Sequence, residues 1–185
     1  MMNDQFFILD IETSGLSNKY SIVEVGIALL DMRYEMVIPY FHCICQESDK
    51  FLDPNAWIFK NSSLSFSFCK DAVDLDDFRE HLQKIFDMGI PVIAYNWAFD
   101  CGFLRDRGFL IEDPPFDPMI VLTNIIKISH VYYGFKFPKV TEAFDYLFPL
   151  LEYKEKHRAL FDAIDEGYIV REVLKRKYID LEVID

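Results

Sequence analysis

Apolar and polar positions alternate or run together in a way that predicts strands first and helices later. Extended apolar segments occupy residues 5–12, 21–31 and 35–45, and the short turns between them favour an antiparallel three-strand meander. A polar loop follows. A short apolar run at 91–96 then predicts a buried strand between helices.

Helical periodicity returns in the second half of the chain. Asp74 is placed to cap a helix that Gly89 ends, and acids fill its first turn. The helices predicted on such signals cover residues 74–89, 97–108, 117–129, 141–148 and 159–178. Helices that alternate with strands indicate an α/β fold, here a mixed sheet with the meander followed by parallel strands and flanked by helices.

The first strand contains two acids where a core strand has none. In FFILDIETSGL, residues 6–16, side chains alternate, so that Asp10 and Glu12 share one face with Phe6 and Ile8. Both faces are otherwise apolar, which is typical of a strand covered on both sides. Two like charges there would repel and lose hydration unless a cation or a proton lay between them. A bound cation is therefore the first hypothesis.

Two further segments place acids and a histidine near predicted apolar faces. In NWAFDCGFL, Asp100 lies in the first turn of a helix, where it either approaches the sheet or merely complements the helix dipole. In HRALFDAIDEG, His157 precedes Asp162 by five residues, which is about 140° around an ideal helix. The two can converge only if His157 lies in the loop before the helix. By itself such a histidine is more often a surface or capping residue.

Composition limits the class of protein. The 185 residues, 51% of them hydrophobic, predict one domain over residues 1–185 with a substantial core. No apolar stretch approaches the roughly 20 residues that span a bilayer, and the first residues carry no secretory signal, so we expect a cytoplasmic or similarly reducing compartment. The four scattered cysteines are expected to be buried free thiols. A net charge of −12 argues against a protein that coats nucleic acid.

The motifs DIETSGL, NWAFDCGFL and HRALFDA, in this order, resemble the three motifs of the DEDDh exonucleases, a branch of the ribonuclease H-like superfamily that includes ribonuclease T. The similarity covers residues 6 to 167. It implies a ribonuclease H-like fold, with Asp10, Glu12, Asp100 and Asp162 as metal ligands and His157 as general base. The variant branch has a tyrosine four residues before the last Asp. Arg158 stands there in this chain, so the histidine branch is favoured.

The resemblance implies two divalent cations, Mg²⁺ or Mn²⁺, for which carboxylate oxygens are suitable ligands. Two such ions would activate a water on one side of a phosphodiester and stabilise the leaving 3′-oxygen on the other. Histidine, with an unperturbed pKa near 6.5, can accept a proton near neutral pH. A loop position would let His157 move in when substrate is present.

The sequence indicates less about which residues contact the substrate. By resemblance, a terminal nucleotide would be received by Thr13, Gly15, Leu16, Asn96 and Phe99. Core packing is a nearly equal explanation for Leu16 and Phe99. The aromatic and basic stretch at 130–139 could stack bases and attract phosphate, although core or dimer contacts are the favoured explanation for several of its aromatic residues.

The predicted function is that of a metal-dependent 3′–5′ exonuclease that releases nucleoside 5′-monophosphates from a single-stranded 3′ end, of DNA or RNA. The acidic charge suits short oligonucleotides, a trimming role, or recruitment by a protein partner. A homodimer is a further candidate assembly, and no membrane partner is expected. The alternative is a non-catalytic binding module of the same fold. Five intact ionisable positions argue against that alternative, because they would cost stability without a function.

Overall fold

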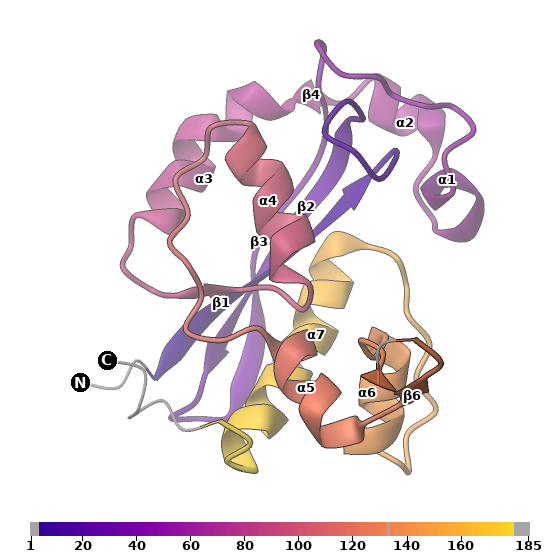
Figure 1. Cartoon of the computed structure of the whole chain (residues 1–185). Coiled ribbons are helices and arrows are strands. Elements are labelled where there is room, and N and C mark those ends of the chain that lie inside the picture. The colour runs from indigo at the N-terminus through magenta and orange to yellow at the C-terminus, as the bar shows by residue number, and fades with distance from the viewer. Residues whose placement is uncertain (1–3, 133, 180–185) are drawn as a thin grey trace.

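The computed structural model describes residues 4–132 and 134–179, and its centre is a five-stranded sheet with the order β4-β3-β2-β1-β5 (Figure 1). The strands are β1 (Gln5–Thr13), β2 (Ile22–Asp31), β3 (Met36–Gln46), β4 (Val73–Asp74) and β5 (Val92–Ile93). Strands β1, β2 and β3 are antiparallel, whereas β5 pairs parallel with β1 and β4 parallel with β3. The predicted meander with parallel strands beside it is confirmed.

The two faces of β1 belong to different hydrophobic clusters. Phe7, Leu9 and Ile11 pack with side chains from α3 (Arg79–Phe86) and α4 (Trp97–Asp106). Phe6 and Ile8 pack on the opposite face with side chains from the helices α5 (Pro118–Ile126), α6 (Val140–Leu147) and α7 (Ala159–Lys175). In Figure 1, α3 and α4 accordingly lie apart from α5, α6 and α7. The predicted strand buried on both sides, with its alternating faces, is confirmed.

The predicted helices are present, with shifted ends. The 74–89 segment begins as a 3-10 turn, η1 (Leu75–Phe78), before it continues as α3, and the Asp74 side chain accepts a hydrogen bond from the Asp76 backbone N–H. Gly89 follows the helix with a φ of 71°, the left-handed conformation that ends helices. Strand β5 is shorter than the predicted 91–96, because only two residues pair with β1 before the chain turns into α4.

Two regions were misjudged from the sequence. The polar loop after β3 contains two short helices, α1 (Ile58–Asn61) and α2 (Phe66–Lys70), and the edge strand β4. The aromatic and basic stretch contains the small strands β6 (Ser129–His130) and β7 (Gly134–Phe135). Its described aromatic residues are exposed, so the expectation of core packing is wrong there: Tyr132, Phe135 and Phe137. Tyr133 lies outside the described residues.

All four cysteines are buried free thiols, as predicted: Cys43, Cys45, Cys69 and Cys101. Burial of the thiol raises the pKa of Cys69 to about 11, which keeps it protonated and unreactive at neutral pH. Among the described helices, none combines the length and apolar character needed to cross a membrane.

Candidate active site

Asp10 and Glu12 lie near the carboxyl end of strand β1, on the face that α7 covers. Asp10 pairs with Gly26 of β2, and Glu12 pairs with Glu24. A Cβ atom at Gly26 would lie 2.2 Å from the backbone of Ala159, so only glycine lets the start of α7 come this close to the sheet. The same contact brings α7 towards the two acids of β1.

Asp100 reaches the same end of β1 from α4. Its carboxylate accepts a hydrogen bond from the backbone N–H of Ile11 at 3.3 Å, and the residue is 5% exposed. Burial raises the pKa of Asp100 to about 7, although the hydrogen bond from Ile11 opposes that rise. Asp100 therefore lies against the sheet and does more than complement the dipole of its helix.

The Asp162 side chain is hydrogen-bonded to the backbone of the loop that precedes α7. Its two carboxylate oxygens accept hydrogen bonds from the backbone N–H groups of Lys156, at 3.2 Å, and Arg158, at 2.7 Å. His157 lies between these donors with a φ of 53°, a left-handed conformation that is uncommon for residues other than glycine. The hydrogen bonds to Asp162 hold the loop in this form, and His157 lies ahead of the helix, as the five-residue spacing required.

Glu12, His157 and Asp162 converge. One ligand atom of each lies within 4.8 Å of the other two. Burial first, and then the neighbouring acids, raise the pKa of Asp10 and of Glu12 well above the ordinary range. Buried carboxylates that face one another are the donor set that hard divalent cations need, and such cations would offset the repulsion. The residues present therefore fit the divalent cations that the motifs imply.

A second layer of contacts holds the His157 loop to the sheet. Glu24 has no exposed side-chain surface, and its carboxylate accepts hydrogen bonds from Arg158 Nε at 3.0 Å and from the Ala159 N–H at 3.0 Å. His42 Nε2 lies 2.6 Å from the same carboxylate. Burial alone would raise the pKa of Glu24, but the bonds from His42, Arg158 and Ala159 together lower it. Glu24 is thus held as an anion.

Replacement of Arg158 by methionine is expected to lower the free energy of unfolding by about 3 kcal/mol, because it removes the arginine partner of the buried Glu24 carboxylate. Chemical denaturation measures the change. Lys84→Met is the matched control, since the Lys84–Glu80 pair is largely exposed and its loss should leave stability almost unchanged. An Arg158→Met protein as stable as the wild type would show that the Glu24 contact contributes little.

The same pair gives a pH dependence. The lowered pKa of Glu24 means that its stabilisation is complete above the usual pKa of a glutamate and is lost as the pH falls through the lowered value. The stability difference between wild type and Arg158→Met should therefore shrink in acid. Denaturation curves at several pH values measure it, and a constant difference would contradict the assignment.

A fifth carboxylate, Glu166, lies beside this group and was not identified from the sequence. It is 4% exposed, stands one helical turn after Asp162, and accepts a hydrogen bond from the Tyr95 backbone N–H at 3.2 Å. The sequence contains a weak signal for it, because positions 162 and 166 fall on one face of a helix. Nothing local marked that position as buried.

The residues expected to receive a nucleotide are only partly brought together. Gly15 and Leu16 line a cavity of about 440 Å³ with Trp57, and Leu16 is 87% exposed, which excludes core packing for it. The Thr13 hydroxyl donates to the Gly15 carbonyl oxygen. Trp57, which no pattern in the sequence singled out, also makes an edge-to-face contact with the His157 ring at 4.6 Å between centroids.

Asn96 and Phe99 belong to the beginning of α4. Asn96 is the residue before the helix, and its side chain makes no capping hydrogen bond. Phe99 is partly buried against the core cluster beneath α3 and α4, so packing accounts for much of its surface. Neither residue lines the cavity that contains Leu16 and Trp57.

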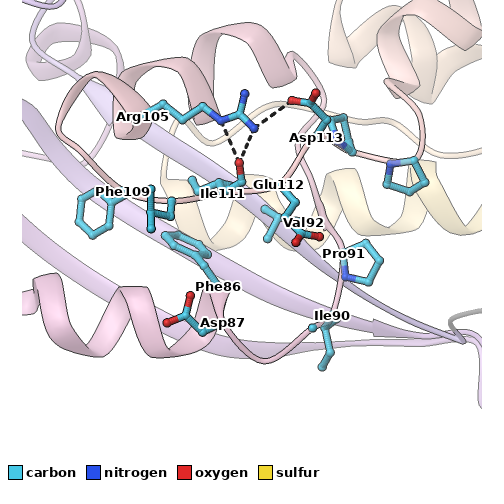
Figure 2. Close-up of a pocket in the computed structure, with 14 residues that line it drawn as sticks. Phe86, Asp87, Ile90, Pro91, Val92, Arg105, Phe109, Ile111, Glu112 and Asp113 are labelled. Carbon is cyan, nitrogen blue, oxygen red and sulfur yellow. Dashed lines mark hydrogen bonds and ion pairs between the residues drawn. The ribbon is translucent and has the colours of Figure 1, made fainter.

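A larger cavity, of about 980 Å³, lies elsewhere (Figure 2). Its wall includes Phe86, Val92 and Phe109, and Arg105 spans one side by binding the Ile111 carbonyl oxygen and the Asp113 carboxylate. None of the predicted site residues lines it. Cavity size therefore does not identify the active site of this protein.

The chain is similar over most of its length to part of a DNA polymerase and to solved structures that include an exonuclease. It is 25% identical over 95% of its length to the PolC-type DNA polymerase III of Caldanaerobacter subterraneus, of which it spans only 12%. It superimposes on Escherichia coli exonuclease I in complex with a dT13 oligonucleotide, with a TM-score of 0.70 and 14% identity over 94% of this chain and 41% of that one. For Schizosaccharomyces pombe Pop2p, in a form with bound Mg²⁺ and Mn²⁺, the TM-score is 0.68 and the identity 16%, over 96% and 86% of the two chains.

Sequence and structure agree on the family. The superpositions are below 25% identity and establish the fold, which is the ribonuclease H-like exonuclease fold that the motifs implied. The sequence model of the RNase T family, described as exonuclease, matches residues 7–169 and so includes all three motifs. The chain therefore belongs to the RNase T family of exonucleases.

Proposed function

We propose that this protein removes nucleotides one at a time from the 3′ end of single-stranded DNA or RNA and releases nucleoside 5′-monophosphates. The observation that carries the proposal is the convergence of Glu12, His157 and Asp162, with Asp10 and Asp100 beside them, in a member of an exonuclease family. Carboxylates and one imidazole, brought together from β1, α4 and the beginning of α7 with the loop before it, are the groups that metal-assisted phosphodiester hydrolysis needs.

Each side chain has a role in this proposal. Asp10, Glu12, Asp100 and Asp162 would hold two divalent cations, Mg²⁺ or Mn²⁺. When bound, these ions supply charge stabilisation for the attacking and leaving oxygens. His157 accepts the proton of the attacking water, and its place in a loop closed by Asp162 keeps the imidazole at the edge of the carboxylate group.

The substrate would enter beside the loop after β1. Thr13, Gly15 and Leu16 are proposed to contact the terminal nucleotide, with Asn96 and Phe99 at the border of its site. The exposed Leu16 side chain and the cavity that it shares with Trp57 support this placement. The net charge of −12 favours a short contact with nucleic acid over long tracking.

The relatives support the substrate class and the cations. Exonuclease I is described in complex with a dT13 oligonucleotide, and Pop2p is described with Mg²⁺ and Mn²⁺ bound. Because this chain covers 12% of the PolC-type polymerase, any function of that larger protein, including association with a polymerase, is outside the proposal.

A degradation assay on matched DNA and RNA oligonucleotides tests the function. Substrates labelled at the 5′ end should shorten stepwise with Mg²⁺ or Mn²⁺, and chelation with EDTA should stop the reaction. A terminal 3′-phosphate should slow cleavage, and chromatography should identify nucleoside 5′-monophosphates. Oligonucleotide binding without shortening would support the non-catalytic binding module instead.

Divalent cations should also raise the melting temperature of the wild-type protein, since a ligand that binds only the folded state stabilises it by mass action. Mn²⁺ titration followed by thermal melting measures the rise. The rise should be smaller in Asp10→Asn, whereas Asp145→Asn, an exposed acid on α6, should respond like the wild type. Equal rises in all three proteins would place the cation elsewhere.

A further inference from the structure

Glu166 is a buried acid to which the proposed reaction assigns no role. It lies four residues after Asp162 on α7 and therefore on the same side of that helix. Only 4% of its surface is exposed. Within the described part of the chain, no lysine, arginine or histidine makes an ion pair or a hydrogen bond with it.

The position of Glu166 is fixed by two close approaches. Its carboxylate accepts the N–H of Tyr95, which follows β5, and the parallel register of β5 with β1 (Ile8 opposite Ile93) brings Tyr95 level with Asp10. A Cβ atom at Gly167 would lie 2.6 Å from the Val37 side chain of β3 and 3.5 Å from the Ile8 side chain of β1, so this turn of α7 packs closely on the sheet. Glu166 is thus held under the acid end of the strand.

A carboxylate at this position adds to the acids of the site. Glu166 lies one helical turn after Asp162 on α7, and its hydrogen-bond donor Tyr95 is level with Asp10. A glutamine at position 166 would accept the same hydrogen bond from Tyr95 without adding a buried negative charge. The hydrogen bond therefore accounts for a polar side chain but not for an anion.

We propose that Glu166 is a fifth carboxylate of the cation site, whose negative charge strengthens the binding of divalent cations beside Asp10 and Asp100. The Tyr95 N–H positions the carboxylate, and Glu166 balances the charge of the cations without needing to contact them. This inference rests on the proposed function, because it assigns Glu166 to the same cations. A unit charge a few ångströms from a dication is worth at least about tenfold in affinity at a partly buried site.

Isothermal titration of Mn²⁺ into the full chain without nucleic acid tests the proposal. Glu166→Gln keeps the acceptor for Tyr95 and removes the charge, so its Kd for Mn²⁺ should rise about tenfold or more. Its melting temperature in EDTA should rise, because a buried repulsive charge is gone. Asp145→Asn, which removes the same charge from an exposed position, should match the wild type in both measurements.

Two further variants distinguish the effect of the Glu166 charge from the effect of its hydrogen bond with Tyr95. Glu166→Ala leaves the Tyr95 N–H unpaired and should melt below Glu166→Gln in EDTA. Glu166→Asp keeps the charge and should bind Mn²⁺ more tightly than Glu166→Ala. A Glu166→Gln protein with wild-type Kd, or an Asp variant no better than Ala, would overturn the proposal.

The results that would reject the proposed exonuclease function differ from those that would reject the role of Glu166. A wild-type chain that neither binds Mn²⁺ nor shortens oligonucleotides would reject the exonuclease assignment itself. If the wild type binds Mn²⁺ and cleaves while Glu166→Gln binds Mn²⁺ equally well, only the role of Glu166 is rejected. Circular dichroism of each variant ensures that folded proteins are compared.

Discussion

Asp10→Ala is expected to lose on the order of 10³-fold or more in turnover, and Asp162→Ala a similar amount, because each removes a carboxylate proposed to hold the catalytic cations. Single-turnover cleavage of a 5′-labelled oligonucleotide at saturating Mn²⁺ measures the loss. Asp145→Asn should keep full activity. Full activity in either site variant would remove that residue from the site.

Both variants should lose activity, but their melting temperatures should change in opposite directions. Asp10 is surrounded by acids, and its loss in the metal-free protein relieves repulsion and a burial cost, so the melting temperature of Asp10→Ala in EDTA should rise. Asp162 accepts the N–H groups of Lys156 and Arg158, and Asp162→Ala should therefore melt lower than the wild type. A lower melting temperature for Asp10→Ala would contradict the account of repulsion.

His157→Ala is expected to lose on the order of 10² to 10⁴ in rate, the contribution of a general base, while the affinities for Mn²⁺ and oligonucleotide change little. His157 lies within 4.8 Å of Glu12 and Asp162 by their ligand atoms, so it is close enough to act as a base or as a ligand. Single-turnover rates measured beside Mn²⁺ titrations distinguish the two roles. A large loss of Mn²⁺ affinity in His157→Ala would make the histidine a ligand.

The pH profile gives a second measure of the same role. The logarithm of the wild-type rate should fall on the acid side of neutral pH, and this limb should disappear or shift in His157→Ala. His81→Ala, which replaces an exposed histidine on α3, is the control and should keep both rate and profile. A His157→Ala protein with near wild-type rate and profile would leave His157 as a loop residue beside the site.

Local rules in the sequence were enough for the early strands and for the faces of β1. Side chains alternate along a strand, so Asp10 and Glu12 had to share a face with Phe6 and Ile8 wherever the strand lay. The Asp74 cap and the stop at Gly89 also depend on neighbours only a few residues away. The position of His157 ahead of α7 followed from its spacing to Asp162.

Local rules could not predict which side chains of the later segments are buried. The exposed residues Tyr132, Phe135 and Phe137 are of the types that fill a core. The short pairing of β5 depends on where α4 turns away. Whether an apolar side chain is covered depends on which distant segment packs on it. That information is absent from a local pattern.

The sequence by itself determined the three motifs, the meander and the order of helices, because these follow from spacings of a few residues. Only the tertiary structure decided that Glu24, 134 positions before Arg158, holds the His157 loop, and that Glu166 accepts the backbone N–H of Tyr95, 71 positions earlier. Both acids look like ordinary polar positions in the sequence. Their roles arise because folding removes them from water and brings them to charges that are remote along the chain, and the cost of burying an acid depends on those partners.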